Sequence, residues 1–374
     1  MQQSAKIERQ PGFLPRADFQ RLLDGVVRSG YQLLGPVVKD GAIQLREISD
    51  VTQLVKGLTN EQQPGRYRLQ QTTGERLFDW NHGPQGLKPL CFAPHEVLWV
   101  EQKEPLSFTT RLPDVKPTAV LGVRGCDLAA LAIQDRHFLH AAGADPHYRQ
   151  RREQLFLIGI DCTHSAESCF CASTGDGPSV NQAVDIGLSE LDDGFLVWSG
   201  SDRGEAVLQQ IDLAAAQTQQ LEQMEHQSDQ AAQEQQRKLP SAEELMRLYQ
   251  RLEHANWQQI AERCLGCGNC TAVCPTCFCY DTQHEVSLDG LSAQNVRQWD
   301  SCFSASHSSM GGFKVRGNIL SRYRQWLTHK LAGWQEQQGR IGCTGCGRCI
   351  TWCPVGIDLT KESDAILWEG SLDE

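Results

Sequence analysis

Residues 264–275 read CLGCGNCTAVCP, and residues 343–354 read CTGCGRCITWCP. Both stretches follow the pattern C-x-x-C-x-x-C-x-x-x-C-P, which is typical of bacterial-type iron–sulfur ferredoxins. Three cysteines at this spacing can lie on one tight loop around a cubane cluster, and the fourth follows about one helical turn later. The glycines of these loops allow positive φ angles and close approach of the backbone; they are Gly266, Gly268, Gly345 and Gly347. The repeat therefore predicts a ferredoxin-like unit that holds two 4Fe–4S clusters.

The two motifs are expected to share their ligands, because in two-cluster ferredoxins the fourth cysteine of each motif serves the other cluster. The expected ligand sets are Cys264, Cys267, Cys270 and Cys353 for cluster 1, and Cys343, Cys346, Cys349 and Cys274 for cluster 2. The alternative is a pair of zinc sites, since C-x-x-C pairs also bind zinc. Zinc needs only two such pairs per site, so the repeated four-cysteine run favours the clusters. Every iron would then carry a protein sulfur, which leaves no open position for a substrate, and we predict no catalytic residue.

Composition narrows the class of protein. The chain has 374 residues, 16 cysteines and a formal net charge of −11. So acidic a chain is not expected to bind nucleic acid, whose phosphate backbone it would repel. No apolar run approaches the length of a membrane span, and the start, MQQSAKIERQ, lacks the pattern of a secretory signal. We therefore expect a cytoplasmic protein whose cysteines serve metal binding or redox chemistry rather than structural disulfides.

Three regions are expected along the chain. Residues 1–204 have the pattern of an α/β domain, with buried strands at AVLGV (119–123) and LFLIGI (155–160) and a helix over 127–139. Residues 205–260 are predicted to form a helical connector that contains one long, largely solvated helix and a second helix that begins at a capping box of Ser241 and Glu244. Residues 261–374 are expected to form an α+β two-cluster ferredoxin domain, with an insertion at 286–338.

Four further cysteines follow the two predicted strands. Cys126 comes after the first strand, and Cys162, Cys169 and Cys171 come after the second. Loops that leave the carboxyl ends of strands in an α/β sheet converge on one crevice. These four thiols are therefore candidate ligands of a third iron–sulfur cluster, with Asp127 as a neighbour. The alternative is a group of buried, inert thiols that pack as small hydrophobic residues.

The remaining cysteines and one basic segment have no single interpretation. Cys277, Cys279 and Cys302 are interpreted mainly as packing residues, although they are also candidates for tuning a cluster potential or for a redox-active thiol group. Cys91 is expected to be structural. The basic segment VRGNILSRYRQWLTHK (315–330) is either a solvated helix face, a docking site for an acidic partner, or a source of positive charge that offsets the clusters.

Several stretches resemble one known family. CPTCFCYD (274–281), WDSC (299–302) and GCTGCGRCITWCPVGID (342–358) resemble the β subunit of cytoplasmic sulfhydrogenases, which are NAD(P)-linked NiFe hydrogenases, and are similar to the electron-transfer subunit of anaerobic sulfite reductase. GVRGCDLAALAIQDRHFL (122–139) and DCTHSAESCFCAS (161–173) resemble the N-terminal domain of that family. The resemblance covers roughly residues 65–360. One departure is Gly125, where the family more often has proline, but Cys126 and Asp127 stay in place.

The resemblance implies a subunit that transfers electrons. In such complexes a flavin subunit takes hydride from NAD(P)H, and a two-cluster subunit relays single electrons to the small and large subunits of a NiFe hydrogenase. The alternative partner is the sirohaem subunit of an anaerobic sulfite reductase. A further hypothesis is a stand-alone thiol/disulfide or sulfur reductase. The sequence has no Gly-x-Gly-x-x-Gly loop after a strand, so we do not expect a dinucleotide site in this chain.

Overall fold

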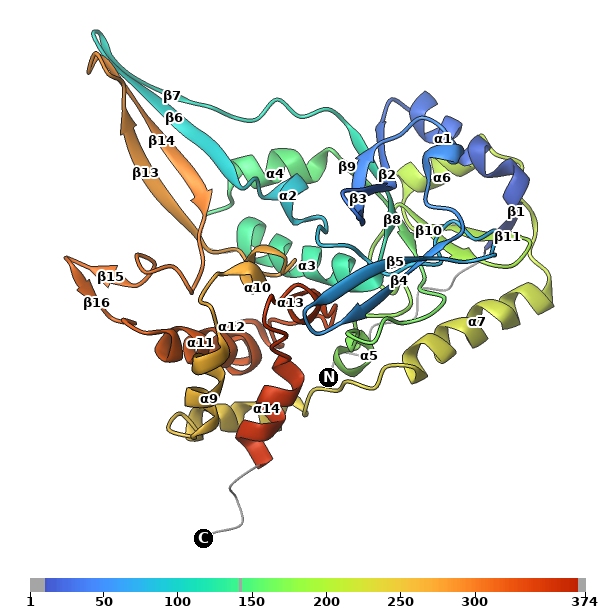
Figure 1. The fold of residues 1–374 in the computed structure, drawn as a ribbon. Coiled ribbons are helices and arrows are strands. Elements are labelled where there is room, and N and C mark those ends of the chain that lie inside the picture. The colour runs from blue at the N-terminus through green and yellow to red at the C-terminus, as the bar shows by residue number, and fades with distance from the viewer. Residues whose placement is uncertain (1–10, 141–142, 369–374) are drawn as a thin grey trace.

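The computed structural model describes residues 11–140 and 143–368, and its centre is an eight-stranded mixed sheet (Figure 1). The three pairings among β2, β8, β9 and β10 are parallel, and the others are antiparallel. In spatial order the strands are β12 (Ala214–Ala215), β1 (Gly12–Pro15), β11 (Gly194–Ser199), β10 (Ile186–Glu190), β9 (Leu155–Ile160), β8 (Thr118–Val123), β2 (Gln32–Lys39) and β3 (Ala42–Glu47).

Both faces of this sheet are covered. Alternate residues of β9 face opposite cores, so that Ile158 packs with α1 and α6 while Leu157 packs with α3, α4 and α7. All six residues of β9 are buried, as expected for a parallel strand between two helical layers. These helices are α1 (Phe19–Arg28), α3 (Gly125–His140), α4 (Pro146–Glu153), α6 (Asp202–Leu208) and α7 (Thr218–Gln233). The strands predicted at 119–123 and 155–160 and the helix predicted at 127–139 are all present.

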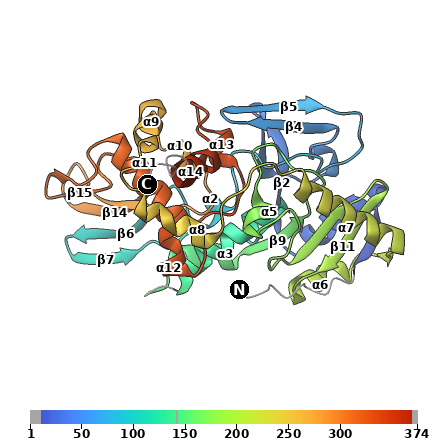
Figure 2. The same ribbon diagram turned by 90° about the horizontal axis from the view of Figure 1, so that it is seen from below.

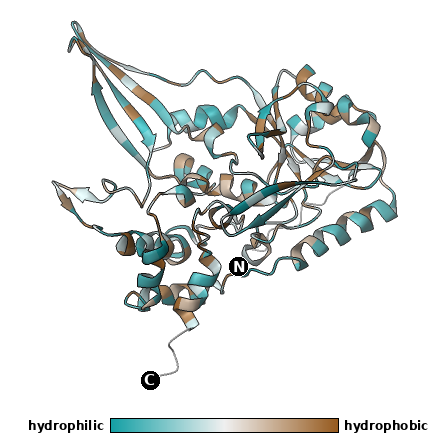
Figure 3. Ribbon diagram, viewed as in Figure 1, coloured by the Kyte–Doolittle hydropathy of each residue, from teal (hydrophilic) through white to brown (hydrophobic). Residues whose placement is uncertain are grey.

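The prediction of one long helix after residue 205 is wrong. The segment forms two helices, α6 and α7, separated by the short strand β12, which pairs with β1 at the edge of the sheet. The cause is the alternating apolar pair Ile211 and Leu213, which packs into the core beside α1 and against Gly12. Seen from below, α7 lies beside β11 (Figure 2), and its surface is largely hydrophilic (Figure 3). The predicted capping box of Ser241 and Glu244 does start α8 (Ala242–Met246), which continues as a 3₁₀ turn, η3 (Arg247–Gln250).

The two cysteine motifs lie in a helical unit with its own apolar core. Each motif forms a loop followed by one short helix, α10 (Asn269–Ala272) or α13 (Arg348–Thr351), and these two helices contact each other. Around them pack α9 (Asn256–Arg263), α11 (Ile319–Thr328), a π-helical turn η4 (His329–Gly333), α12 (Trp334–Gln338) and α14 (Leu359–Trp368). The molecule is thus a mixed α/β fold with the cysteine motifs in its C-terminal part.

Two β structures connect the halves of the chain. A four-stranded antiparallel sheet, seen as a projecting arm in Figure 1, combines β6 (His95–Lys103) and β7 (Leu106–Thr110) with β13 (Tyr280–Val286) and β14 (Ser292–Trp299). Arg297 on β14 forms a buried ion pair with Glu96 on β6 at 2.6 Å. The hairpin of β4 (Leu58–Gln63) and β5 (Arg66–Gln71) lies against α13, where Gln62 Oε1 accepts a hydrogen bond from Thr351 at 3.1 Å.

The other elements are short. They are η1 (Arg16–Asp18), η2 (Val51–Gln53), α2 (Lys88–Cys91), α5 (Cys171–Thr174), β15 (Ser309–Met310) and β16 (Phe313–Lys314). Of these, α5 matters most for the site, because it begins at one of the candidate ligand cysteines.

Candidate iron–sulfur centres

The structure brings together the four cysteines expected to bind cluster 1. Cys264, Cys267 and Cys270 come from the loop between α9 and α10, and Cys353 follows α13. Burial raises the pKa of Cys270 well above its usual value, and the neighbouring Cys264 and Cys353 raise it further. All four cysteines line one pocket, whose wall also includes Cys349 of the second set. Cys353 therefore lies close to the three cysteines of the first motif, as the crossed assignment requires.

The four cysteines expected to bind cluster 2 also converge. Burial raises the pKa of Cys349 well above its usual value, with further increases from Cys343, Cys274 and Cys346. Cys274, Cys343 and Cys346 are buried, whereas Cys267 of the first set is exposed. The two sets are neighbours, because Cys270 of the first set and Cys349 of the second line the same pocket and Cys270 further raises the pKa of Cys349. One candidate centre therefore lies at the surface, and the other lies inside the protein.

The local backbone explains why the motif has glycines. The N–H groups of Gly266 and Gly345 donate to the Sγ atoms of Cys264 and Cys343, both at 3.4 Å. Gly345 has a φ of 64°, and a Cβ atom there would come within 2.5 Å of the backbone of Cys171. Glycine is thus required both by the conformation of the loop and by the close approach of a second cysteine-bearing segment.

The cavity of the first set fits a cubane cluster. Its walls are apolar apart from the cysteines, and they include Phe303, Tyr323 and Trp326. Tyr323 Oη and Trp326 Nε1 are buried without a hydrogen-bond partner. Buried donors are normally satisfied, and the sulfides of a cluster in this cavity would accept from them. The donor set, the cavity and the two unsatisfied donors agree with a bound 4Fe–4S cluster.

The basic segment 315–330 faces inward at its end. Lys330 is buried, and its Nζ donates to Thr276 Oγ1 at 2.9 Å, to the carbonyl oxygen of Gly342 at 3.1 Å and to Cys274 Sγ at 3.5 Å. Arg322 and Arg324 donate hydrogen bonds to the backbone carbonyl oxygens of Phe303 and Leu252. Lys330 therefore places positive charge beside Cys274, an expected ligand of cluster 2, in agreement with the charge-offset interpretation of this segment.

The cysteines proposed for a third cluster form a group of their own. Cys126 at the start of α3 and Cys171 at the start of α5 pack together with Cys346 in a small buried cluster. The thiols of Cys169 and Cys162 lie close enough to Cys171 to raise its pKa further, after the larger effect of burial. The loops that follow β8 and β9 therefore meet as expected, and they meet directly against the second cysteine motif.

Two buried guanidinium groups flank this third set. Arg348, between two cysteines of the second motif, forms a bidentate ion pair with Asp127 at 2.6 and 2.8 Å. Arg124 is 1% exposed and donates to the carbonyl oxygens of Asp161 and Phe78 at 2.9 Å. Its positive charge counteracts the effect of burial, which raises the pKa of Cys162. Positive charge at this position suits a group of thiolates.

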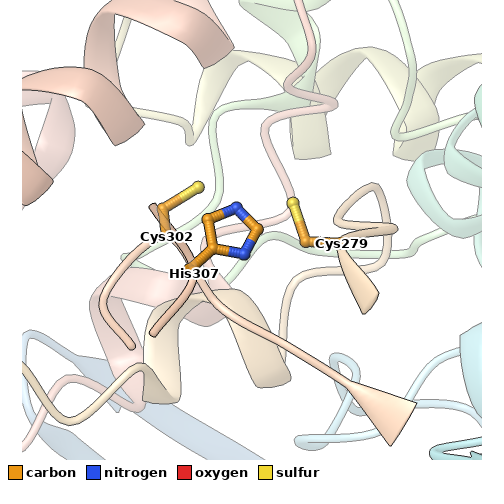
Figure 4. Close-up of side chains that lie close together, drawn as sticks. All are labelled: Cys279, Cys302 and His307. Carbon is orange, nitrogen blue, oxygen red and sulfur yellow. The ribbon is translucent and has the colours of Figure 1, made fainter. Parts of the chain in front are cut away.

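The three cysteines without a single interpretation divide into two groups. Cys277 hydrogen-bonds to Cys274, so it contacts an expected ligand of cluster 2. Cys279, Cys302 and His307 form a second group, in which the imidazole lies between the two thiols (Figure 4). Hydrogen bonds from Cys279 and His307 lower the pKa of Cys302 to about 4. Cys91 is fully buried, as expected of a packing residue.

Sequence reasoning missed several residues of these centres. Tyr323, Trp326 and His307 lie in the insertion, and no spacing pattern connects them with the cysteine motifs. Arg348 and Lys330 had a weak signal, since each is a basic residue within or near a stretch already assigned to the clusters. Their roles depend on burial, which a motif does not reveal.

Comparison with known proteins agrees with this geometry. A family model described as a 4Fe-4S dicluster domain matches residues 263–357. The chain is 34% identical over 305 residues to sulfhydrogenase 2 subunit beta of Pyrococcus furiosus, an alignment that covers 80% of this chain and 89% of the relative. No solved structure matches significantly.

No helix in the described residues is long and apolar enough to cross a membrane. The family model confirms the expected iron–sulfur clusters of the C-terminal part. The identity to the relative, together with its coverage of both chains, confirms the suspected family. The chain belongs to the sulfhydrogenase β-subunit family and contains a 4Fe–4S dicluster domain.

Proposed function

We propose that the chain is the electron-transfer subunit of a cytoplasmic NAD(P)-linked NiFe hydrogenase. It relays electrons between a flavin subunit that binds NAD(P)H and the small and large hydrogenase subunits. The observation that carries the proposal is a row of neighbouring thiol sets, from the exposed Cys267, through the pocket that Cys270 and Cys349 share, to the contact of Cys346 with Cys126. The related sulfhydrogenase β subunit supports the choice of complex.

The proposed ligands are the crossed sets, Cys264, Cys267, Cys270 and Cys353 for one cluster and Cys343, Cys346, Cys349 and Cys274 for the other. Bound 4Fe–4S clusters supply one-electron redox chemistry at potentials that hydrogen bonds and burial adjust. The chain holds the thiolates in place, excludes water with Phe303 and Trp326, and places Lys330 as a positive charge. Since each set provides four thiolates, the iron atoms have no vacancy for a substrate.

We further propose that Cys126, Cys162, Cys169 and Cys171 bind a third cluster, which extends the row into the α/β part. Anaerobically purified, fully loaded protein should then contain about twelve iron atoms per chain. Cys162→Ser should lower the iron content by about four atoms, whereas Cys91→Ala, which removes an isolated buried thiol, should leave it unchanged. An iron content near eight per chain in both wild type and Cys162→Ser would refute the third cluster.

The experiment that tests the hydrogenase assignment is purification of the intact complex from its native host through a tag on this subunit. Nickel without sirohaem supports an NAD(P)-linked hydrogenase. Sirohaem without nickel would assign the chain to an anaerobic sulfite reductase, the alternative that the stretch CPTCFCYD (274–281) keeps open. Reduction of a disulfide or sulfur compound by the isolated subunit with an artificial electron donor would instead support a stand-alone reductase.

A further inference from the structure

A compact group of three metal-binding side chains lies outside the proposed iron–sulfur ligands. Cys279 Sγ, Cys302 Sγ and a ring nitrogen of His307 all lie within 4.8 Å of one another. Within residues 11–140 and 143–368, no other group of three or more His, Cys, Asp or Glu residues meets this distance. Neither the dicluster motif nor the third set includes any of these three residues.

The spacing of the donor atoms distinguishes this group from the cluster sites. Ligands of one tetrahedral zinc ion lie about 3.5–3.8 Å apart, as follows from Zn–S and Zn–N bonds of about 2.3 and 2.0–2.1 Å. The sulfur ligands of a cubane bind four different iron atoms and are therefore farther apart. The donor atoms of the trio all lie within 4.8 Å of one another, which is compact enough for one ion to bind all three after a small adjustment.

The histidine is held in the orientation that a ligand needs. His307 Nδ1 is 2.5 Å from Asp300 Oδ2, which fixes the ring and leaves Nε2 for the sulfur side (Figure 4). A carboxylate that accepts from the second ring nitrogen is the usual partner of a metal-bound histidine, because it sets the tautomer and the ring orientation. Packing alone would not require this arrangement.

The position of the group in the fold indicates that an ion bound there would connect two segments of the chain. Cys279 and Asp300 face each other at the base of the β13–β14 hairpin, where the Asp300 N–H donates to the carbonyl oxygen of Cys279 at 3.0 Å. Cys302 and His307 belong to the irregular loop that follows. The same loop carries Phe303, which lines the cavity of cluster 1. An ion bound here would attach this covering loop to the chain that leaves the first motif.

We propose that Cys279, Cys302 and His307 bind one zinc ion. Two thiolates and one imidazole form a donor set that suits zinc. A water molecule from the neighbouring open pocket, which Cys279 and Asp300 line, would complete the tetrahedron. The proposal does not depend on the identity of the electron-transfer partners.

The test is metal analysis of the anaerobically purified, full-length protein after removal of loosely bound metal. Wild type should contain about one zinc ion per chain in addition to its iron. Cys302→Ser and His307→Ala should lose the zinc and keep the iron and the cluster electron paramagnetic resonance (EPR) signals. His307→Cys should retain zinc as a three-thiolate site, and Cys91→Ala is the control for loss of an unrelated thiol.

Cobalt exchange gives a second measurement, whose first readout is the spectrum of the wild type itself. Tetrahedral thiolate-bound Co²⁺ should produce intense visible bands that Cys302→Ser lacks. Zinc-free wild type, or a loss of iron instead of zinc in Cys302→Ser, would overturn the proposal. It would also fail if a reductant alone, rather than a chelator, released Cys279 and Cys302 for alkylation, since that result would identify a disulfide.

Discussion

Single polar atoms around the clusters are expected to set their potentials. Tyr323 Oη is buried beside the first cysteine set and has no hydrogen-bond partner in the protein. A donor to a cluster sulfide stabilises the reduced, more negative state. Tyr323→Phe should therefore lower the potential of cluster 1 by about 20–60 mV, the equivalent of one net hydrogen bond. An EPR-monitored redox titration measures this shift, and cluster 2 in the same sample is the internal control.

Lys330 is expected to raise the potential of cluster 2. Its ammonium group is buried and 3.5 Å from Cys274 Sγ, so it favours the reduced cluster by direct attraction. Lys330→Met should lower the potential of cluster 2 on the order of 100 mV, the effect of one charge a few ångströms away at an effective dielectric constant of about 20. Lys330→Arg keeps the charge and should shift the potential much less. Equal shifts in both variants would show that packing, not charge, is responsible.

At the scale of elements, one ion pair connects α3 with α13. Asp127 and Arg348 are both buried, and they link the helix of Cys126 to the helix of the second motif. Asp127→Asn leaves a buried guanidinium without its counter-charge and should lower the free energy of unfolding by about 3 kcal/mol. Denaturant unfolding under anaerobic conditions measures the loss.

A surface ion pair provides the control for that experiment. Asp192 pairs with Arg76 at 2.7 Å, but its side chain is 80% exposed. Asp192→Asn should change the free energy of unfolding by less than about 1 kcal/mol. Similar losses in Asp127→Asn and Asp192→Asn would contradict a special role for the buried pair.

The elements also show which parts of the fold can be predicted from sequence. The strands at 118–123 and 155–160 were predictable from sequence. Strands buried on both faces consist of continuous apolar residues, and such a run can be recognised locally. The break between α6 and α7 was not predictable, because Val207, Ile211 and Ala214 continue a helical spacing, whereas the contact of Leu213 with Gly12 is with a strand about 200 residues earlier. The sheet of β6 with β14 joins segments almost 200 residues apart, and no local pattern encodes such a pairing.

For the whole molecule, the positions of the candidate ligands were more predictable than their surroundings. The spacing of Cys264 to Cys274 fixes a loop, and the topology of a parallel sheet places Cys126 near Cys162. The contact between Cys346 and Cys126 follows only from tertiary packing of the loop at 168–171 against Gly345. The division into regions at 204 and 260 stays a prediction. Elements of different regions share sheets, since β12 pairs with β1 and β14 pairs with β6.

The burial of the thiol sets predicts where electrons cross the surface. The proposed cluster 1 is the exposed end of the proposed row, because Cys267 is exposed, and Leu265, which is 63% exposed, lies within the same cysteine loop. A partner that exchanges electrons there must cover this side chain, and a carboxylate in its place would be desolvated at a cost. Leu265→Glu should therefore slow NAD(P)H-driven electron flow through the assembled complex about tenfold, which corresponds to about 1.4 kcal/mol.

Two comparisons make this last prediction specific. Reduction of the clusters by dithionite should be unchanged in Leu265→Glu, because a small reductant needs no protein interface. Leu288, at the tip of the β13–β14 hairpin, is fully exposed and remote from the cysteine loop, so Leu288→Glu should leave electron flow unchanged. If Leu288→Glu slowed the flow and Leu265→Glu did not, the partner would dock on the projecting sheet, and the exposed side of cluster 1 would not be the docking site.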